Sequence, residues 1–184
     1  MAYHGHTDEL ERRKWQNPEA ILAGIGLKSG LIFMDIGCGN GFFALPAARM
    51  VGESGKVYGV DINAGSITNL KKLAGREGLN NLDLTIGKAE DIVRCEACAD
   101  IIFLGIVLHD FESPARVLEN ARKMLKPGGR LVNLDWKKEP MEFGPPVQIR
   151  FSQEEAVRLI KAGGFRVQTV KESGPYHYLV IAGH

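Results

Sequence analysis

The residues best suited to chemistry gather in a short glycine-rich segment, FMDIGCGNGFF, at residues 33–43. Gly37, Gly39 and Gly41 have the spacing G-x-G-x-G, and they stand between an apolar run and a helical pattern. Glycines in such a turn let a ligand approach the backbone beside the N-terminus of the following helix. Asp35 adds a carboxylate, which would repel a pyrophosphate and attract an ammonium group. The segment therefore predicts a binding site for a ligand with a positively charged end.

A second carboxylate and an acidic loop define more of the expected ligand. Asp61 ends the next apolar run about twenty residues later, where an acidic side chain can accept hydrogen bonds from both hydroxyls of a ribose. Ile62 beside it could cover one face of an adenine. The loop GKAED contains Ala89 and Glu90, whose backbone amide and carboxylate could bind the edge of the adenine. Phe42 stands where the dinucleotide fingerprint G-x-G-x-x-G would have its last glycine, which disfavours an NAD-dependent oxidoreductase.

Short apolar runs alternate with helical patterns from residue 31 onward. The expected strands of this part cover residues 31–37, 56–62, 82–87, 99–105 and 129–136. Their apolar content is typical of parallel strands that helices cover on both faces. Two further strands, at 165–173 and 176–183, are too close in sequence for a parallel crossover and must form an antiparallel hairpin. We expect an α/β fold with a Rossmann-like, doubly wound, seven-stranded sheet, mostly parallel with an antiparallel C-terminal hairpin.

Helix ends are marked at several places. Asn17 is followed by proline and is expected to open a short helix before the first strand. Ser113 is expected to cap another helix, which the sequence KPGG at 126–129 should end. Ser152 and Glu155 have the spacing of a capping box. These signals separate the expected helices from the strands that carry the candidate site.

Length, charge and hydropathy limit the classes of protein. The 184 residues fit a single domain, 1–184, in which residues 1–30 form an N-terminal helical flap. The formal net charge of +1 is far from the basic balance of a nucleic-acid-binding protein, so no nucleic-acid partner is expected. No run approaches the roughly 18 apolar residues of a membrane span, and residues 1–15 lack the apolar core of a signal peptide. We expect a cytoplasmic protein, and its oligomeric state stays open.

The three cysteines do not form an obvious metal site. Cys95 and Cys98 have the CxxC spacing of zinc ligands and redox pairs, whereas Cys38 lies inside the glycine segment. Zinc needs four ligands, so we expect no metal and interpret the pair as two incidental small residues. A local disulfide is the alternative.

Five segments together resemble the class I S-adenosylmethionine-dependent methyltransferases, and in particular the small-molecule branch that includes the UbiE/COQ5 quinone-biosynthesis enzymes. The segments are MDIGCGNG, VYGVDI, GKAEDI, ADIIFLGIVLHDF and ARKMLKPGGRLVNLD. The resemblance covers about residues 31–184. It implies a seven-stranded sheet with the last strand reversed, which agrees with the hairpin inferred above.

The resemblance implies S-adenosylmethionine as cofactor. The cofactor-binding residues that it implies are Asp35, Gly37, Cys38, Gly39, Asn40, Gly41, Asp61, Ile62, Ala89, Glu90 and Gly105. Asp35 and the glycine turn would hold the methionine portion, and Asp61 the ribose. Ala89 and Glu90 would contact the adenine, although related enzymes often have GDAE where this chain has Lys88 in GKAE.

The implied reaction is methyl transfer to a small-molecule acceptor by in-line displacement. A sulfonium is already an activated methyl donor, so a catalytic base is needed only when the acceptor arrives protonated. His109, in GIVLHDF after the fourth expected strand, is the candidate base, and a packing role is its alternative. Two other functions stay open, a protein that binds the cofactor without catalysis and an RNA methyltransferase. The acceptor could be a quinone precursor, another metabolite, a thiol or a metalloid.

Two segments are candidates for covering the site. Residues 1–15 carry more aromatic and imidazole side chains than a solubilising tail needs, namely Tyr3, His4, His6 and Trp15. Residues 137–150 form a long loop with the apolar residues Met141 and Phe143. We expect both segments to border the acceptor pocket.

Overall fold

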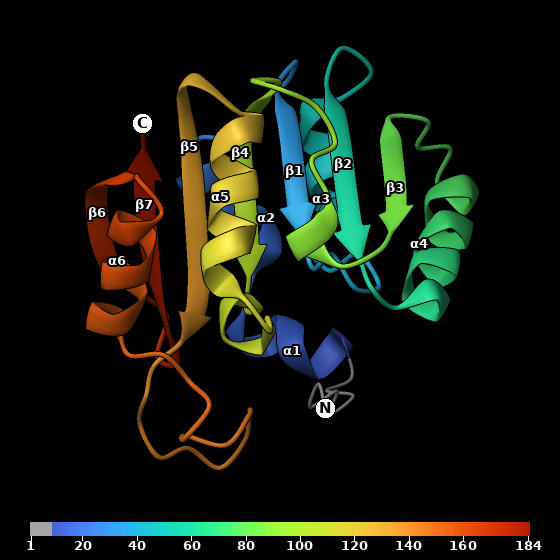
Figure 1. Cartoon of the computed structure of the whole chain (residues 1–184). Helices are drawn as coiled ribbons and strands as arrows, with labels where there is room; N and C mark the ends of the chain where they lie inside the picture. The colour runs from blue at the N-terminus through green and yellow to red at the C-terminus, as the bar shows by residue number, and fades with distance from the viewer. Residues whose placement is uncertain (1–8) are drawn as a thin grey trace.

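The computed structural model describes residues 9–184 and places seven strands in one sheet (Figure 1). The strands are β1 (Ile32–Ile36), β2 (Lys56–Asp61), β3 (Leu82–Ile86), β4 (Ala99–Gly105), β5 (Leu125–Trp136), β6 (Arg166–Ser173) and β7 (His177–Gly183). Their order in the sheet is β3-β2-β1-β4-β5-β7-β6. The first five strands are parallel, and β7 runs antiparallel to both β5 and β6. The expected mostly parallel, doubly wound sheet with an antiparallel C-terminal hairpin is confirmed.

Helices cover both faces of the sheet. The helices are α1 (Glu9–Trp15), α2 (Pro18–Gly24), α3 (Ala44–Val51), α4 (Ala64–Arg76), α5 (Pro114–Met124) and α6 (Gln153–Ala162), with short 3-10 turns η1 (Ala89–Asp91) and η2 (Leu108–Asp110). Buried side chains of α2, α3 and α4 share one core with the sheet, and those of α5 and α6 share the other. The α1 helix lies beyond the carboxyl ends of the central strands (Figure 1).

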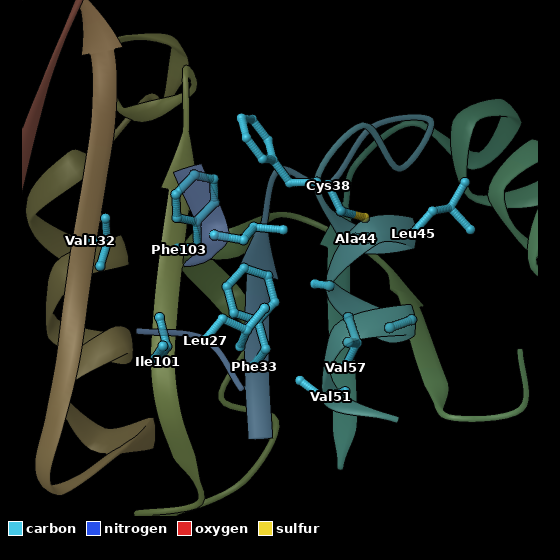
Figure 2. Close-up of a cluster of buried hydrophobic side chains, with 14 of the residues drawn as sticks. Leu27, Phe33, Cys38, Ala44, Leu45, Val51, Val57, Ile101, Phe103 and Val132 are labelled. Carbon is cyan, nitrogen blue, oxygen red and sulfur yellow. The ribbon is translucent and has the colours of Figure 1, made fainter. Parts of the chain in front are cut away.

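Aromatic packing makes the centre of the sheet rigid just below the glycine segment. Phe33 of β1 and Phe103 of β4 are fully buried, and their ring centroids are 5.8 Å apart. Figure 2 shows both side chains on neighbouring strands. Phe43, which precedes α3, adds its ring 4.7 Å from that of Phe103. Each buried aromatic ring stabilises the fold by roughly 2–3 kcal/mol through removal of apolar surface from water. The strand ends that carry the candidate site are therefore held by a well-packed core.

The expected helix ends are mostly confirmed. The Asn17 side chain accepts from the backbone N–H of Ala20 at 2.9 Å and caps α2. Ser152 and Glu155 form both hydrogen bonds of the capping box at the start of α6. Ser113 precedes α5, but the expectation that its side chain caps the helix is wrong, because the side chain makes no capping hydrogen bond. The proline after Ser113 already sets the first helical φ and removes one N–H that would need a cap.

The helix before residues 126–129 ends at Met124 as expected, but the expected start of the next strand at residue 129 is wrong. β5 begins at Leu125, so these residues belong to the strand and not to a loop before it. The β4–β5 register moves from Ala99 opposite Leu125 to Ile101 opposite Arg130, and the extra residues bulge out of the ladder. Asp100 of β4 accepts from the Lys126 ammonium at 2.9 Å, which ties the start of the bulge to the neighbouring strand.

Cys95 and Cys98 are paired as a disulfide in the loop before β4, so their interpretation as incidental residues is wrong. Ala97 between them has a left-handed backbone with φ of 44°, and this turn brings the two Cα atoms to 6.0 Å. The loop lies at the amino end of β4, which is the opposite edge from the carboxyl ends of the strands. The disulfide therefore takes no part in the candidate site. Within residues 9–184 no helix is long and apolar enough to cross a membrane.

Candidate active site

The glycine segment lies where the strand order of the sheet reverses, between β1 with its neighbour β2 on one side and β4 on the other. Open α/β sheets bind ligands at this place, beyond the carboxyl ends of the strands. The N–H groups of Gly37 and Cys38 both donate to the Val60 carbonyl, at 2.7 and 3.1 Å. Gly41 N–H donates to the Cys38 carbonyl at 2.9 Å and closes the turn. The turn is thus fixed against the end of β2.

The three glycines of the turn have different roles. A Cβ atom at Gly37 would lie 2.5 Å from Val107, and one at Gly41 would lie 2.4 Å from Leu70, so close packing requires glycine at both positions. Gly39 has φ of +51°, and a Cβ there would meet no atom within 4 Å. The space above Gly39 is therefore an open cradle in which a ligand can approach the backbone.

The two other residues of the turn point in different directions. Cys38 is buried in the core on the side of α3 (Figure 2), and burial raises the pKa of its thiol, so the side chain stays neutral and away from any ligand. Only its backbone could contact a cofactor. Asn40 is exposed, and its side-chain oxygen accepts from the Asn69 amide at 3.2 Å.

Asp61 places a fixed carboxylate beside the cradle. One oxygen accepts from Gly39 N–H at 2.7 Å and the other from Asn63 N–H at 2.8 Å. Each carboxylate oxygen has a further lone pair, so both can still accept from ligand hydroxyls. Ile62 next to it is 63% exposed, an unusual state for a large apolar side chain and one that a ligand ring could cover. The expected ribose and adenine positions are compatible with this geometry.

Asp35 is a buried carboxylate whose Oδ2 atom has no hydrogen-bond partner. Burial, and then the negative charge of Asp61, raise the pKa of Asp35 to about 7, and the positive charge of Arg12 partly opposes them. Buried polar atoms without a partner are uncommon and need an explanation. A ligand ammonium group would supply both the donor and the charge that Asp35 lacks.

Side-chain contacts from α5 hold the loop after β3. The Asn120 amide donates to the carbonyls of Ala89 and Glu90, at 3.1 and 2.8 Å. The Glu90 carboxylate accepts from the backbone N–H of Ser113 at 3.3 Å, so it is partly engaged within the protein. Lys88 pairs with an acidic residue of the next loop, Glu112, at 2.8 Å. Asn120 was not among the residues predicted from the sequence, although a polar residue within the apolar stripe of an expected helix is a readable signal.

The end of β4 bends sharply at Gly105 and Ile106. A Cβ atom at Gly105 would lie 2.6 Å from Phe103 and 3.0 Å from Phe43, so this position also needs a glycine. Ile106 has φ of 62°, which is strained for a β-branched residue, and its N–H donates to the Leu134 carbonyl at 2.7 Å. This bend carries the following residues back over the glycine turn, where Val107 packs on Gly37.

His109 lies beside a carboxylate that the sequence analysis did not single out. Its side chain is 2% exposed, and its Nδ1 atom is 2.8 Å from Oδ1 of Asp135, which is buried near the end of β5. Burial by itself would lower the pKa of His109, but the Asp135 carboxylate outweighs it and raises that pKa above its ordinary value. Nε2 faces Asp110, whose Oδ1 atom is 3.6 Å away. Asp135 is thus the acidic neighbour of Nδ1, although Nδ1 makes no hydrogen bond of suitable geometry with it.

Rings from three separate segments meet beside these strand ends, and we call them the aromatic cluster: Trp15, Trp136, Phe143, Tyr176 and His177. The Trp15 ring of α1 lies 5.6 Å from Trp136, 5.6 Å from Phe143 and 5.5 Å from His177. Burial, followed by nearby positive charges, lowers the pKa of His177 to about 3, so its imidazole is neutral. The cluster joins α1, the 137–150 loop and the C-terminal hairpin. Tyr3, His4 and His6 lie outside the described residues.

Arg150 organises the 137–150 loop from inside. Its buried guanidinium donates to four backbone carbonyls, those of Pro145 at 2.7 Å, Glu139 at 3.0 Å, Lys137 at 3.2 Å and Phe143 at 3.2 Å. Hydrogen bonds from a charged donor are among the stronger ones in proteins. The loop is thus a built structure, although nothing local in the sequence indicated this role for Arg150.

The donors and acceptors of the site fit a ligand with a ribose and a cationic end. Gly39 leaves room, Asp61 offers two acceptors, and Asp35 offers a buried charge without a partner. Within residues 9–184, no three His, Cys, Asp or Glu side chains come together in a way that could hold a metal ion.

Curated relatives of the chain are quinone methyltransferases. It is 25% identical to a demethylmenaquinone methyltransferase of Bacillus velezensis over 134 aligned residues, and the alignment covers 73% of this chain and 56% of the relative. It is 29% identical to the ubiquinone/menaquinone biosynthesis C-methyltransferase UbiE of Hydrogenovibrio crunogenus over 127 aligned residues, and this alignment covers 68% of this chain and 49% of the relative. The chain thus spans about half the length of these relatives.

A solved structure agrees over nearly the whole chain. The crystal structure of a SAM-dependent methyltransferase from Aquifex aeolicus superposes with a TM-score of 0.88 at 32% identity, covering 93% of this chain and 91% of that chain. Residues 27–171 match the family described as a methyltransferase domain, and this range includes the glycine turn, Asp61 and His109, whereas Trp15, Tyr176 and His177 of the aromatic cluster lie outside it. The chain therefore belongs to the methyltransferase-domain family, and it is an enzyme whose cofactor is S-adenosylmethionine.

Proposed function

We propose that this protein transfers the methyl group of S-adenosylmethionine to a small, planar acceptor with a hydroxylated aromatic ring. The assignment of S-adenosylmethionine as the methyl donor is supported above all by Asp35, whose buried Oδ2 atom has no hydrogen-bond partner, and by the open cradle at Gly39. The acceptor half of the proposal is supported by the aromatic cluster at the same edge and by relatives named as quinone methyltransferases. The fold itself would serve many acceptors.

The cofactor residues then take the following roles. Asp61 would accept hydrogen bonds from the ribose hydroxyls, and Ile62 would cover the adenine. Ala89 and Glu90, held by Asn120, would contact the adenine edge. Asp35 would bind the methionine ammonium, and the backbone of residues 37–41 would line the rest of this portion, with Gly105 at its border. The exposed Asn40 lies at the rim of the same turn.

Methyl transfer from a bound sulfonium needs an aligned nucleophile and little covalent chemistry from the protein. A phenolic hydroxyl keeps its proton near neutral pH, so its reaction is faster when a base removes that proton. His109 is the residue that we propose for this step. The Asp135 carboxylate, 2.8 Å from Nδ1, would favour the tautomer with the proton on Nδ1, so that Nε2 would accept the proton of the acceptor.

The acceptor proposal is tested by incubating the protein with S-adenosylmethionine that carries a labelled methyl group and a panel of acceptors. The panel contains a naphthoquinol, a catechol, an aliphatic thiol, a primary amine and arsenite, and products are identified by mass spectrometry. We expect label on the quinol or the catechol. Label on the thiol, amine or arsenite alone would overturn the aromatic acceptor. Cofactor binding without transfer to any of the five would favour a binding protein without catalysis.

The role of His109 is tested with His109→Gln and, as a control on the exposed side of α5, Glu119→Gln. Loss of a positioned base typically lowers turnover by about 100-fold or more, so we expect that loss only in His109→Gln, with cofactor affinity unchanged. Turnover of the unaltered protein should rise with pH through the raised pKa of His109, and the variant should lose this rise. An unchanged pH profile in the variant would assign His109 to packing.

A further inference from the structure

The α1 helix carries a guanidinium group to the glycine turn. The Cζ atom of Arg12 lies 3.8 Å from the ring centroid of Phe42 and 5.5 Å from that of Phe43, the two residues that directly follow Gly41. A guanidinium in this position over a ring is attracted to the face of the ring. Arg12 is therefore held above the segment that would receive the methionine portion of the cofactor.

Gln16, the residue directly after α1, contacts Arg12. Arg12 Nε donates to the side-chain oxygen of Gln16 at 2.7 Å, and because a guanidinium can only donate, this contact fixes which end of the Gln16 amide is oxygen. The other end, Nε2, is a donor without a hydrogen-bond partner, on a side chain that is only 3% exposed. A buried donor without a partner costs free energy unless a ligand supplies the acceptor.

The charge of Arg12 acts on the cofactor pocket. It lowers the pKa of Asp35 against the larger effects of burial and of Asp61, and it also lowers the pKa of His177 in the aromatic cluster. The next basic residues of α1 are paired with carboxylates of the chain itself, Arg13 with Glu19 at 3.0 Å and Lys14 with Glu11 at 2.6 Å. Arg12 is the α1 cation whose field reaches Asp35.

The amino-acid end of S-adenosylmethionine carries an ammonium and a carboxylate on the same carbon atom. Asp35 would pair with the ammonium group of the cofactor. The carboxylate of the cofactor needs hydrogen-bond donors close by. We propose that Arg12 and Gln16 bind this carboxylate, so that α1 and the residue after it contribute to the cofactor site. This proposal rests on the proposed use of S-adenosylmethionine but not on the identity of the acceptor. The buried acceptor of Asp35 and the buried donor of Gln16 would then both be satisfied by one ligand.

Through α1, binding of the cofactor would precede formation of the acceptor pocket. Trp15 lies on the same helix and packs into the aromatic cluster with the 137–150 loop and the hairpin. A cofactor carboxylate held by Arg12 would keep α1 across the strand ends, and Trp15 would then hold one wall of the acceptor side. Cofactor binding would therefore help to build the acceptor pocket.

The test compares two ligands by isothermal titration calorimetry with the full chain. S-adenosylhomocysteine has the ammonium and the carboxylate, whereas decarboxylated S-adenosylmethionine keeps the ammonium and lacks the carboxylate. Arg12→Gln should weaken S-adenosylhomocysteine by about 10- to 100-fold, the range for hydrogen bonds to a charged group, and should change the decarboxylated ligand by about twofold or less. Lys14→Gln, on the same helix, should change neither.

Each other outcome has a definite meaning. Equal weakening of both ligands by Arg12→Gln would mean that Arg12 only supports the structure of α1, and unchanged affinity for both would place the carboxylate elsewhere. Either result overturns the assignment of Arg12 while leaving the cofactor in place. Failure of the unaltered protein to bind either ligand would instead overturn the cofactor site and this assignment with it.

Discussion

Replacing Asp35 by asparagine should stabilise the cofactor-free protein at alkaline pH and at the same time remove tight cofactor binding. Asp35 is 2% exposed, one of its oxygens has no partner, and its pKa is raised to about 7. A carboxylate in this state is kept for a ligand, because on its own it weakens the fold. Asparagine has nearly the same shape and cannot ionise.

The sign and size of the effect follow from proton linkage. An unfolded aspartate titrates near 3.8, so between that pH and about 7 the folded chain keeps a proton that the unfolded chain has released. The free energy of unfolding should therefore fall by about 1.4 kcal/mol per pH unit over this window and level off near 7, a total of roughly 4 kcal/mol. The buried amide of asparagine costs roughly 1–3 kcal/mol at any pH, since its donors also lack partners. The variant should thus be more stable by about 1–3 kcal/mol at pH 8 and nearly equal to the unaltered protein at pH 5.

The assay is urea unfolding followed by circular dichroism at pH 5, 6, 7 and 8 without cofactor. The difference between the two proteins isolates Asp35, because His109 and His177 titrate in both. Asp91→Asn, an exposed acidic residue in η1, serves as the control and should follow the unaltered protein. Parallel stability curves for Asp35→Asn and the unaltered protein would refute the reasoning, since they would mean that Asp35 ionises normally. Titration with S-adenosylhomocysteine should also weaken tenfold per pH unit below 7 in the unaltered protein only.

Three further predictions concern the frame around this carboxylate. Gly39→Ala should lower stability by only about 1–2 kcal/mol, because the added Cβ meets open space, but it should strongly weaken cofactor binding. Gly41→Ala should lower stability more, because its Cβ would lie 2.4 Å from Leu70. Equal melting temperatures for the two variants would contradict these roles. Asn120→Ala leaves two loop carbonyls without their donor and should lower stability by about 1–3 kcal/mol and weaken adenosine-containing ligands in a titration. Arg150→Met should lower stability by roughly 3 kcal/mol or more and expose the 137–150 loop to trypsin, and a loop that stays resistant would show that the four carbonyl contacts are dispensable.

The parts of the fold that could be predicted from the sequence depend on near neighbours in the chain. The cap at Asn17 and the box at Ser152 each involve atoms three residues apart, so their geometry follows from the helix itself. The glycine turn and Asp61 were recognisable because the strand-to-helix unit fixes their spacing. The hairpin followed from a link too short for a crossover.

The parts that could not be predicted depend on contacts that only the folded sheet creates. Asp135 is a candidate partner of His109 only when β4 and β5 lie side by side, which brings together two residues of different segments. Gln16 became informative through a hydrogen bond that leaves its other end without a partner in a buried place. The left-handed Ile106 had no signal at all, because its conformation is imposed by the packing around it and opposed by its own preference.

The proposed contacts of the amino-acid end have a consequence for turnover. Methyl transfer removes the positive charge of the sulfonium but leaves the ammonium and the carboxylate of the cofactor unchanged. Asp35, Arg12 and Gln16 would therefore hold the product as they hold the substrate, and α1 would stay across the strand ends after the reaction. S-adenosylmethionine and S-adenosylhomocysteine would then be distinguished by the electrostatic attraction between the sulfonium and the nearby carboxylates of Asp35 and Asp61. Because screening and the distance to a sulfur make this attraction weak, S-adenosylhomocysteine should be a strong inhibitor, and Arg12→Gln should relieve that inhibition together with the affinity for the cofactor.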